Sequence, residues 1–181
     1  MLFRSSGGGK LIFERDLRTS RFTGVKVHSL LSDVLLAELM VPSSDLWLVS
    51  PWISDVDVID NSGGVYDSVL DNPSSRAYRF SEVLGMLTRA RSKLRVVTRP
   101  NASSGFLRNL GYVADNEYLR IVFDDDVHEK TFCGDDWQIT GSMNYTFNGM
   151  HRNDERISYR VDAKMAAITR VEFTNRFGSL W

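Results

Sequence analysis

Residues 127–155, VHEKTFCGDDWQITGSMNYTFNGMHRNDE, hold more reactive side chains at ordered spacings than any other stretch of the 181-residue chain. His128 and Lys130 are separated by one residue. In a strand, two such side chains point to the same side. The stretch therefore predicts an imidazole beside an ammonium on the cleft side of a strand, with Phe132 and Cys133 leading into the core.

A tight turn is expected after this strand, at Gly141, because glycine accepts backbone conformations that other residues resist. Ser142 and Asn144 would then supply a hydroxyl, an amide and free backbone N–H groups, and such a concavity suits an anion. This combination supports displacement at phosphorus. A neutral imidazole attacks a phosphodiester to form a covalent phosphohistidine, while lysine, amide and hydroxyl groups neutralise the phosphate oxygens, and no metal is required.

Six residues of this stretch, in this order and spacing, resemble the signature of the phospholipase D superfamily: His128, Lys130, Asp135, Gly141, Ser142 and Asn144. The resemblance implies that His128 is the nucleophile, that Lys130 and Asn144 bind phosphate, and that Ser142 is a supporting donor. It also implies that Asp135 is one of the catalytic residues. The family usually has six residues between its Asp and the Gly-Ser pair, whereas five follow Asp135 here, so Asp136 is the alternative for the motif carboxylate. The competing interpretation is a surface strand followed by an ordinary hairpin, which leaves the combination unexplained.

The end of the stretch also resembles the small bacterial nucleases of this superfamily. Residues 153–155 are Asn-Asp-Glu, similar to their Asn-x-Glu, and residues 144–146 are Asn-Tyr-Thr, similar to their Asn-aromatic-Thr. The resemblance implies that Glu155 is the partner of a histidine. A carboxylate behind an imidazole would hold its tautomer and stabilise the imidazolium.

The motif occurs once, whereas most enzymes of the superfamily carry two copies in one chain. The other histidines, His28 and His151, are not followed by a lysine two residues on. If one histidine attacks phosphorus and another protonates the leaving oxygen, the second must come from another subunit. The sequence therefore predicts a homodimer with a composite site, since a twofold interface brings one patch against its own copy.

The whole chain predicts a single α/β domain, a phospholipase D-like sandwich in which helices flank a mixed β-sheet. Apolar spacing predicts helices over 25–40, 80–93, 105–110 and 163–177, and strands over 45–53, 94–98, 118–123 and 156–161. Residues 1–24 are expected to be a flexible lead-in before the catalytic domain at 25–181, and residues 55–75 a surface excursion. The strand at 45–53 resembles the family strand that ends near the active cleft. This implies that Ser50 and Trp52 line the substrate path, with packing as the alternative for Trp52.

Charge and cysteine content limit the kinds of partner and site that the chain is expected to have. With 22 Lys and Arg against 23 Asp and Glu, the chain lacks the overall basic surface of many nucleic-acid-binding proteins. The local phosphate-binding candidates, with solvated surface as the alternative, are Arg15, Arg18, Arg21, Arg89, Arg91, Arg95 and Arg99. The acidic run at 124–126 is interpreted as solvated, the single cysteine excludes an internal disulfide, and no metal site or cofactor is expected. Without a targeting signal or a long apolar segment, the chain is expected to be cytoplasmic.

The function expected from these residues is metal-independent cleavage of nucleic acid, with DNA favoured over RNA as the partner. Residues 49–53, VSPWI, also resemble bacterial phospholipase-D-like proteins encoded with DNA-modification or anti-phage systems. That resemblance implies cleavage of foreign DNA alongside other defence proteins. Two alternatives stay open: a phospholipase or phosphatidyl transferase acting on membrane lipids, and a non-catalytic nucleic-acid-binding subunit of a defence complex.

Overall fold

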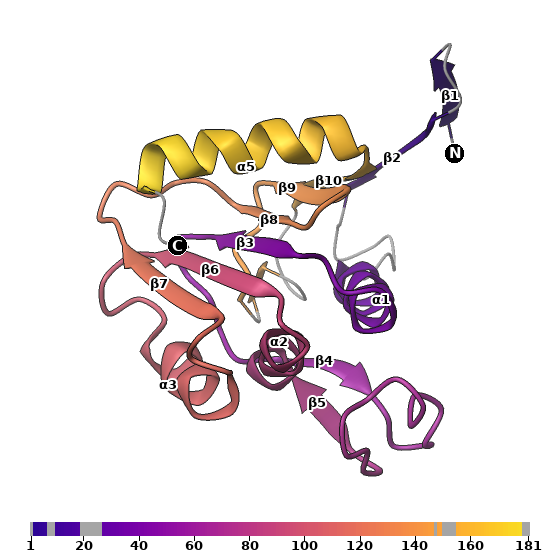
Figure 1. The fold of residues 1–181 in the computed structure, drawn as a ribbon, viewed down its shortest axis with the longest axis vertical. Coiled ribbons are helices and arrows are strands. Elements are labelled where there is room, and N and C mark those ends of the chain that lie inside the picture. The colour runs from indigo at the N-terminus through magenta and orange to yellow at the C-terminus, as the bar shows by residue number, and fades with distance from the viewer. Residues whose placement is uncertain (1, 7–9, 19–26, 147, 150–154, 179–181) are drawn as a thin grey trace.

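The computed structural model describes residues 2–6, 10–18, 27–146, 148–149 and 155–178, which form a mixed sheet with helices on both faces (Figure 1). In these residues the sheet has eight strands in the order β1-β2-β10-β9-β8-β3-β6-β7. Their bounds are β1 (Leu2–Ser6), β2 (Lys10–Arg18), β3 (Asp45–Val49), β6 (Lys93–Thr98), β7 (Leu119–Phe123), β8 (Thr131–Cys133), β9 (Trp137–Gly141) and β10 (Arg156–Val161). β3, β6 and β7 run parallel, and the other neighbouring pairs run antiparallel. The predicted α/β domain with a mixed sheet is confirmed.

Helices make the crossovers that parallel strands require. α2 (Phe80–Arg89) precedes β6, and α3 (Ser104–Val113) joins β6 to β7. Together with α1 (Val27–Met40) they cover one face of the sheet, while α5 (Ala163–Phe177) covers the other (Figure 1). None of the helices within the described ranges is both long and apolar enough to cross a membrane.

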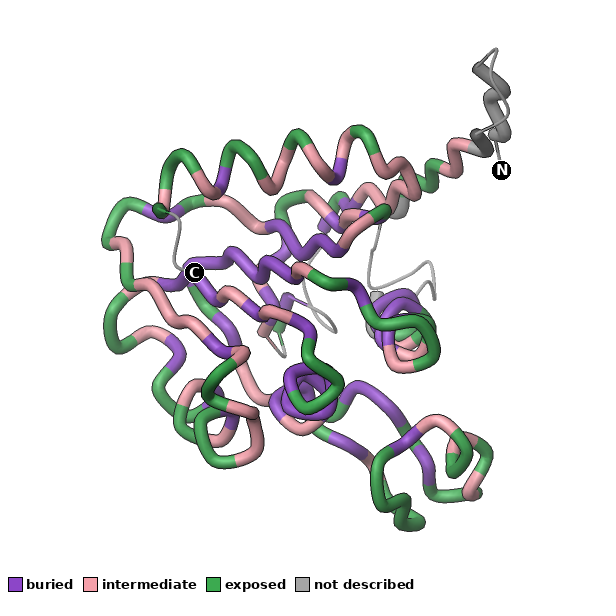
Figure 2. The backbone as a smooth tube through the Cα atoms, viewed as in Figure 1, coloured by how far each residue is buried: buried purple, intermediate pink, exposed green. Residues whose placement is uncertain are grey.

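Burial is deepest along the central strands, which both helical layers cover (Figure 2). On the side of α2, the ring of Phe80 lies 6.0 Å from that of Phe132. On the other side, Trp47 of β3 lies 5.6 Å from Phe173 of α5. Strands covered on both faces read as continuous apolar runs, and Leu46, in the run that starts β3, is fully buried.

Residues 1–24, expected to be a flexible lead-in, contain two strands in their described part. β1 and β2 form an antiparallel hairpin, and β2 pairs with β10 from Phe13 opposite Val161 to Arg18 opposite Arg156. Without β2, one edge of β10 would present unpaired N–H and C=O groups. Backbone groups form these hydrogen bonds whatever the side chains are. The side-chain pattern of the sequence therefore indicates this strand only weakly. Residues 7–9 and 19–26 lie outside the described part of the chain.

The surface excursion expected at residues 55–75 contains a buried strand. β4 (Asp57–Asp60) pairs with β5 (Ala77–Arg79) in a second, two-stranded sheet. Val58 and Ile59 are fully buried within β4. The surrounding Asp, Asn, Ser and Gly residues are typical of loops, so the sequence pattern does not indicate this strand.

Candidate active site

Strand register brings the sequence-predicted site to one edge of the main sheet. β3 ends at Val49, which lies opposite Thr131, the first residue of β8. β6 ends one residue beyond the partner of Val49. The segments that follow β3 and β6 therefore meet the segment that precedes β8, because β8 runs antiparallel to β3. These three segments carry Trp52, Arg99 and His128.

β9 and β10 extend this edge. Thr140 of β9 lies opposite Thr131, so Ser142 continues beyond the same edge. β10 begins beside Gly141, which places Glu155 there as well. The candidate site is therefore assembled from the ends of β3, β6, β8, β9 and β10, and its position depends on the register of all of them.

His128 and Lys130 precede β8, so the prediction that this pair lies in a strand is wrong. The chain turns directly before them, where Asp124 Oδ1 accepts a hydrogen bond of 2.7 Å from the backbone N–H of Asp126, and Val127 is fully buried as an anchor. His128 is exposed. The Lys130 ammonium donates to the carbonyl oxygen of His128 at 2.6 Å. The two residues are adjacent at the edge, but the backbone of His128, and not a shared strand face, holds the ammonium.

Arg99 joins His128 to Trp52. Its Nη2 lies 3.2 Å from Nδ1 and 3.3 Å from Nε2 of His128, and its guanidinium carbon lies 4.9 Å from the centre of the Trp52 ring. A guanidinium can only donate, so the ring nitrogen that receives its hydrogen bond carries a lone pair. Trp52 is 43% exposed, which leaves its indole accessible beside the imidazole.

Ser50 does not face the substrate path. The residue is fully buried, and its hydroxyl donates to the carbonyl oxygen of Trp52 at 3.0 Å. Beside it, the Thr98 hydroxyl donates to the carbonyl oxygen of Pro51 at 3.1 Å. Proline ends the strand pairing because it has no N–H group. The predicted contact of Ser50 with substrate is therefore corrected: Ser50 fixes the turn that presents Trp52.

Ser142 and Glu155 are hydrogen-bonded to each other. The Ser142 hydroxyl donates to Glu155 Oε2 at 2.5 Å and accepts from the backbone N–H of Arg156 at 3.1 Å. The close approach of the two segments requires glycine at Gly141, where a Cβ atom would lie 2.1 Å from the carbonyl oxygen of Arg156. Glu155 as the partner of a histidine stays a prediction, because His151 lies outside the described residues.

The side-chain carbonyl oxygen of Asn144 is buried and has no hydrogen-bond partner among the described residues. The next residue, Tyr145, anchors the segment: it is fully buried, its carbonyl oxygen accepts from the Ser54 N–H at 2.8 Å, and it forms a bridge with Ile53. Burial raises the pKa of the Tyr145 hydroxyl far above its ordinary value, so this group stays neutral. An unsatisfied buried carbonyl oxygen costs about 1–3 kcal/mol, and a ligand group that donates a hydrogen bond to Asn144 would offset that cost.

Asp135 lies at the opposite end of β8 from His128. Its Oδ2 accepts from the Ser44 N–H at 2.7 Å, and its Oδ1 accepts from the Asp45 N–H at 3.3 Å. The seven-residue separation from His128 corresponds to on the order of 20 Å of extended chain. The predicted catalytic role of Asp135 is corrected accordingly: the carboxylate ties the β8–β9 turn to the start of β3. Asp136, the alternative, lies in the same turn.

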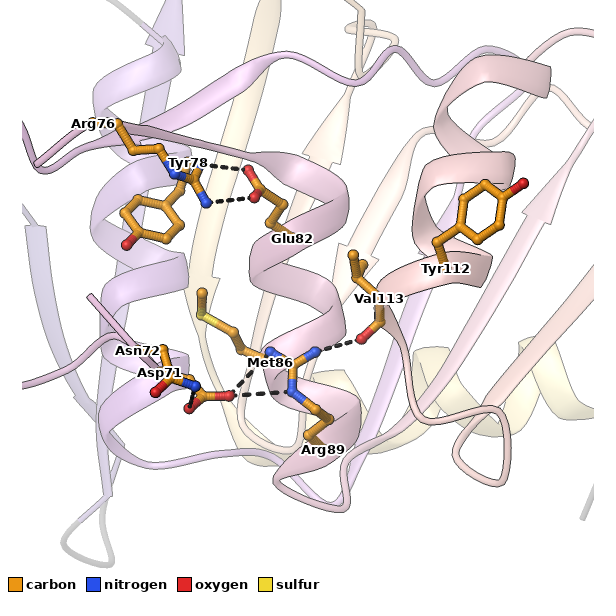
Figure 3. A pocket seen from close by; sticks show the side chains of 9 residues that line it. All are labelled: Asp71, Asn72, Arg76, Tyr78, Glu82, Met86, Arg89, Tyr112 and Val113. Atoms are coloured by element: carbon orange, nitrogen blue, oxygen red, sulfur yellow. Dashed lines mark hydrogen bonds and ion pairs between the residues drawn. The ribbon is translucent and has the colours of Figure 1, made fainter. Parts of the chain in front are cut away.

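One arginine of the predicted 89–99 cluster lines a separate cleft of about 550 Å³ (Figure 3). There Arg89 lies 3.2 Å from the carboxylate of Asp71. In the same cleft, Arg76 donates two hydrogen bonds, of 2.9 and 2.7 Å, to Glu82. Figure 3 shows both guanidinium groups turned toward their carboxylates, so the positive charge in this cleft is already balanced.

Arg95 and Arg99 of the same cluster differ in their partners. Arg95 lies 2.7 Å from the carboxylate of Asp45. In the described part of the chain, no carboxylate lies within ion-pair distance of Arg99, and its Nε is buried without a hydrogen-bond partner. Arg99 is therefore the arginine of this cluster whose charge is available at the candidate site. The signal in the sequence was its position, directly after a buried strand and before Pro100.

The described residues show no cluster of three or more His, Cys, Asp or Glu side chains that could hold a metal ion. Within the acidic run at 124–126, Asp124 lies 3.7 Å from Arg176. Cys133 is buried, and burial raises the pKa of its thiol to about 12, so it stays protonated. The described side chains at the edge offer imidazole, ammonium, guanidinium, amide and hydroxyl groups.

Comparison with solved structures finds proteins that share this fold. Nuc from Salmonella typhimurium, described as a phospholipase D family member, has a TM-score of 0.59 at 13% identity, over 91% of this chain and 93% of its own. The chain has the phospholipase D fold. NucT from Helicobacter pylori matches with a TM-score of 0.55 at 9% identity, over 91% of this chain and 94% of its own. The archaeal chromatin protein TrmBL2, described as showing a novel mode of DNA binding, matches with a TM-score of 0.51 at 11% identity, over 91% of this chain and 51% of its own.

Comparison at the sequence level adds no relative: no protein-family model matches, and no curated protein matches. At identities of 9 to 13%, the phospholipase D fold is what the solved structures share with this chain. This confirms the fold that the motif resemblance implies. The role of each site residue rests on the residues and geometry described above.

Proposed function

We propose that this protein is a metal-independent phosphodiesterase that cleaves nucleic acid through a covalent intermediate on His128. The observation that carries the proposal is the accessible imidazole of His128 in contact with the Arg99 guanidinium, at the sheet edge that also carries Lys130 and Asn144. Groups that neutralise phosphate charge around one nucleophile suit displacement at phosphorus.

The reaction proceeds in two steps. First, an imidazole nitrogen of His128 bonds to phosphorus while the bond to the leaving oxygen breaks, and that oxygen takes a proton from an acid. Second, water attacks the phosphohistidine, the nitrogen–phosphorus bond breaks, and the former acid receives the proton of the water. We assign the acid to the partner subunit's His128, because the sequence has one His-x-Lys pair and a second copy of it has to come from another subunit. The active form is then a homodimer with a composite site.

Nucleic acid is the substrate class that suits the surroundings of His128. The accessible indole of Trp52 suits a base, and the guanidinium of Arg99 suits a phosphate. The description of TrmBL2, which shares the fold, as a DNA-binding protein supports the same class. A phospholipase would use the same charged groups, so the substrate has to be tested directly.

The test is incubation of the purified protein in EDTA with single-stranded DNA, double-stranded DNA, RNA and phospholipid vesicles. We expect cleavage of a nucleic acid, a loss of about a thousandfold or more in His128→Ala, and unchanged activity in the exposed-surface control Arg108→Gln. Acid quenching followed by mass spectrometry should find a phosphate adduct on the peptide that contains His128.

The other outcomes of this test would indicate a different function. Hydrolysis of vesicles alone would identify a phospholipase, and nucleic-acid binding without turnover would identify a binding subunit. Equal turnover by wild type and His128→Ala would remove the proposed mechanism.

A further inference from the structure

We propose that Trp52 and Arg99 together form a base-stacking site, so that the substrate presents an unpaired nucleobase next to the phosphate at His128. The inference rests on the proposed function and deepens it by naming single-stranded nucleic acid as the substrate. Its basis is the arrangement of the three side chains: Trp52 is 43% exposed, and one guanidinium contacts both its ring and the imidazole.

The backbone that carries Trp52 is fixed before any ligand arrives. The Ser50 hydroxyl donates to the Trp52 carbonyl oxygen at 3.0 Å, and the following N–H, of Ile53, donates to the Ser103 hydroxyl at 2.9 Å. Ser103 in turn lies 2.9 Å from the Thr98 hydroxyl at the end of β6. A ring held in this way loses little conformational entropy on binding, which favours affinity.

Among the described residues, a second pair of a tryptophan ring and a guanidinium has a structural role. Arg95 lies over Trp47 at 4.9 Å, the distance at which Arg99 lies over Trp52. Trp47, however, is 1% exposed, and Arg95 is paired with a carboxylate. The pair at the sheet edge has an accessible ring and an arginine without a carboxylate partner in the described residues. A ligand can reach an exposed ring and an arginine without a carboxylate partner. It cannot reach a buried ring whose arginine is already paired.

Stacking on an aromatic ring selects unpaired bases. In a duplex both faces of a base are covered by its neighbours, whereas a single strand offers a free face, and aromatic and arginine side chains in single-strand-binding proteins use it. Stacking is tolerant of sequence because every base has such a face. We therefore expect a preference for single strands with little preference for base identity.

Arg99 couples substrate binding to the nucleophile. In the free protein its Nη2 donates toward the imidazole of His128, where it engages a ring nitrogen lone pair. A phosphate oxygen is a better acceptor for a guanidinium than a neutral imidazole. When the phosphate arrives, Arg99 transfers this hydrogen bond to it, and the lone pair that attacks phosphorus becomes available.

A binding cycle tests the stacking site separately from catalysis. Fluorescence anisotropy in a His128→Ala background, which cannot form the covalent intermediate, compares a labelled thymidine strand, an abasic strand of equal length and a duplex. We expect Trp52→Ala to weaken binding of the thymidine strand about 5- to 150-fold, the ~1–3 kcal/mol of one stacked base, and to leave the abasic strand unchanged. Trp52→Phe should retain most of the affinity. The control Tyr112→Ala, at a residue that is 82% exposed, should change neither strand.

Several outcomes would overturn the stacking site. Equal weakening of both strands by Trp52→Ala would mean that the ring shapes the surface without stacking on a base. Undetectable binding of both strands, tighter binding of the duplex, or a requirement for Trp52 only with vesicles would do the same. If His128→Ala still cleaves, the proposed function fails, but the comparison of thymidine and abasic strands still reports on Trp52.

Discussion

The hydroxyl of Ser142 donates a hydrogen bond of 2.5 Å to Glu155, a residue that is 9% exposed. A hydrogen bond to a buried carboxylate contributes more to stability than one between neutral groups. We expect Ser142→Ala to lower the free energy of unfolding by about 1.5–3 kcal/mol, measured by urea denaturation. The matched control is Ser62→Ala, which removes a bond of the same length to Asp60, an exposed carboxylate. An equal loss in both variants would contradict the role of burial.

Asp135→Asn should reduce stability and leave catalysis intact. The carboxylate accepts two backbone N–H groups at the start of β3, at the opposite end of β8 from His128. Loss of these charge-assisted bonds should lower the free energy of unfolding by about 1–3 kcal/mol, whereas kcat of the folded variant stays within twofold of wild type. Asp136→Asn, at an exposed neighbour, is the control. A hundredfold loss of kcat in fully folded Asp135→Asn would restore the catalytic assignment.

Arg99→Lys should behave as a loss of function despite keeping the charge. An ammonium is a point donor and does not reproduce the planar fork that spans the indole and the imidazole. We expect kcat/KM for single-stranded DNA to fall about 10- to 100-fold. The control is Arg108→Lys, at an exposed residue. Full activity in Arg99→Lys would show that the charge alone is used.

Mixing subunits should reveal the composite site. If both copies of His128 act at one phosphorus, a dimer with one His128→Ala subunit is inactive. After unfolding and refolding of mixtures, activity should then fall as the square of the wild-type fraction. A linear fall would mean that each subunit works alone.

Glu38 should make the stability of the fold depend on pH. Its carboxylate accepts from the N–H and hydroxyl of Ser43 at 2.9 and 2.8 Å, and from the indole N–H of Trp137. Burial outweighs these bonds and raises the pKa of Glu38 above 4.5. The folded protein then holds this proton more tightly than the unfolded chain. The stability that Glu38 contributes is full below about pH 4.5 and is lost as the pH rises through the raised pKa.

Urea denaturation of Glu38→Gln at several pH values checks this. The variant cannot titrate, so its free energy of unfolding should decline less than that of wild type as the pH rises above about 4.5. Glu117→Gln, at an exposed residue, should follow the wild-type curve. Parallel curves for Glu38→Gln and wild type would show that Glu38 does not titrate differently in the folded state.

Elements set by local pattern could be predicted from the sequence. α5 begins and ends where apolar spacing places it, because Asp162 caps its first turn by accepting from the N–H groups of Lys164 and Met165. β3 and β6 follow from continuous apolar runs. β2 leaves only a weak local pattern in the sequence, because its pairing satisfies a distant strand edge.

The candidate site divides in the same way. His128, Lys130 and Asn144 could be predicted as site residues because they belong to one short motif in the sequence. The contact of Arg99 with His128 was not, because it depends on the register of three strands that are far apart in the sequence. Ser50 and Trp52 are two residues apart, yet one is fully buried and the other is 43% exposed. Periodicity in the sequence does not predict this difference in exposure, because the turn at Pro51 determines where each side chain points.

The pairing of β2 with β10 has a consequence for synthesis on the ribosome. β2 ends at Arg18, and the strand that completes its hydrogen bonding begins at Arg156. At ~5–20 residues per second, β2 is synthesised on the order of ten seconds before β10 exists. Contacts of such large sequence separation form late in folding. The nascent chain therefore carries β2 with one edge unpaired until β10 has been synthesised, and Glu155, directly before β10, joins the candidate site only at that time.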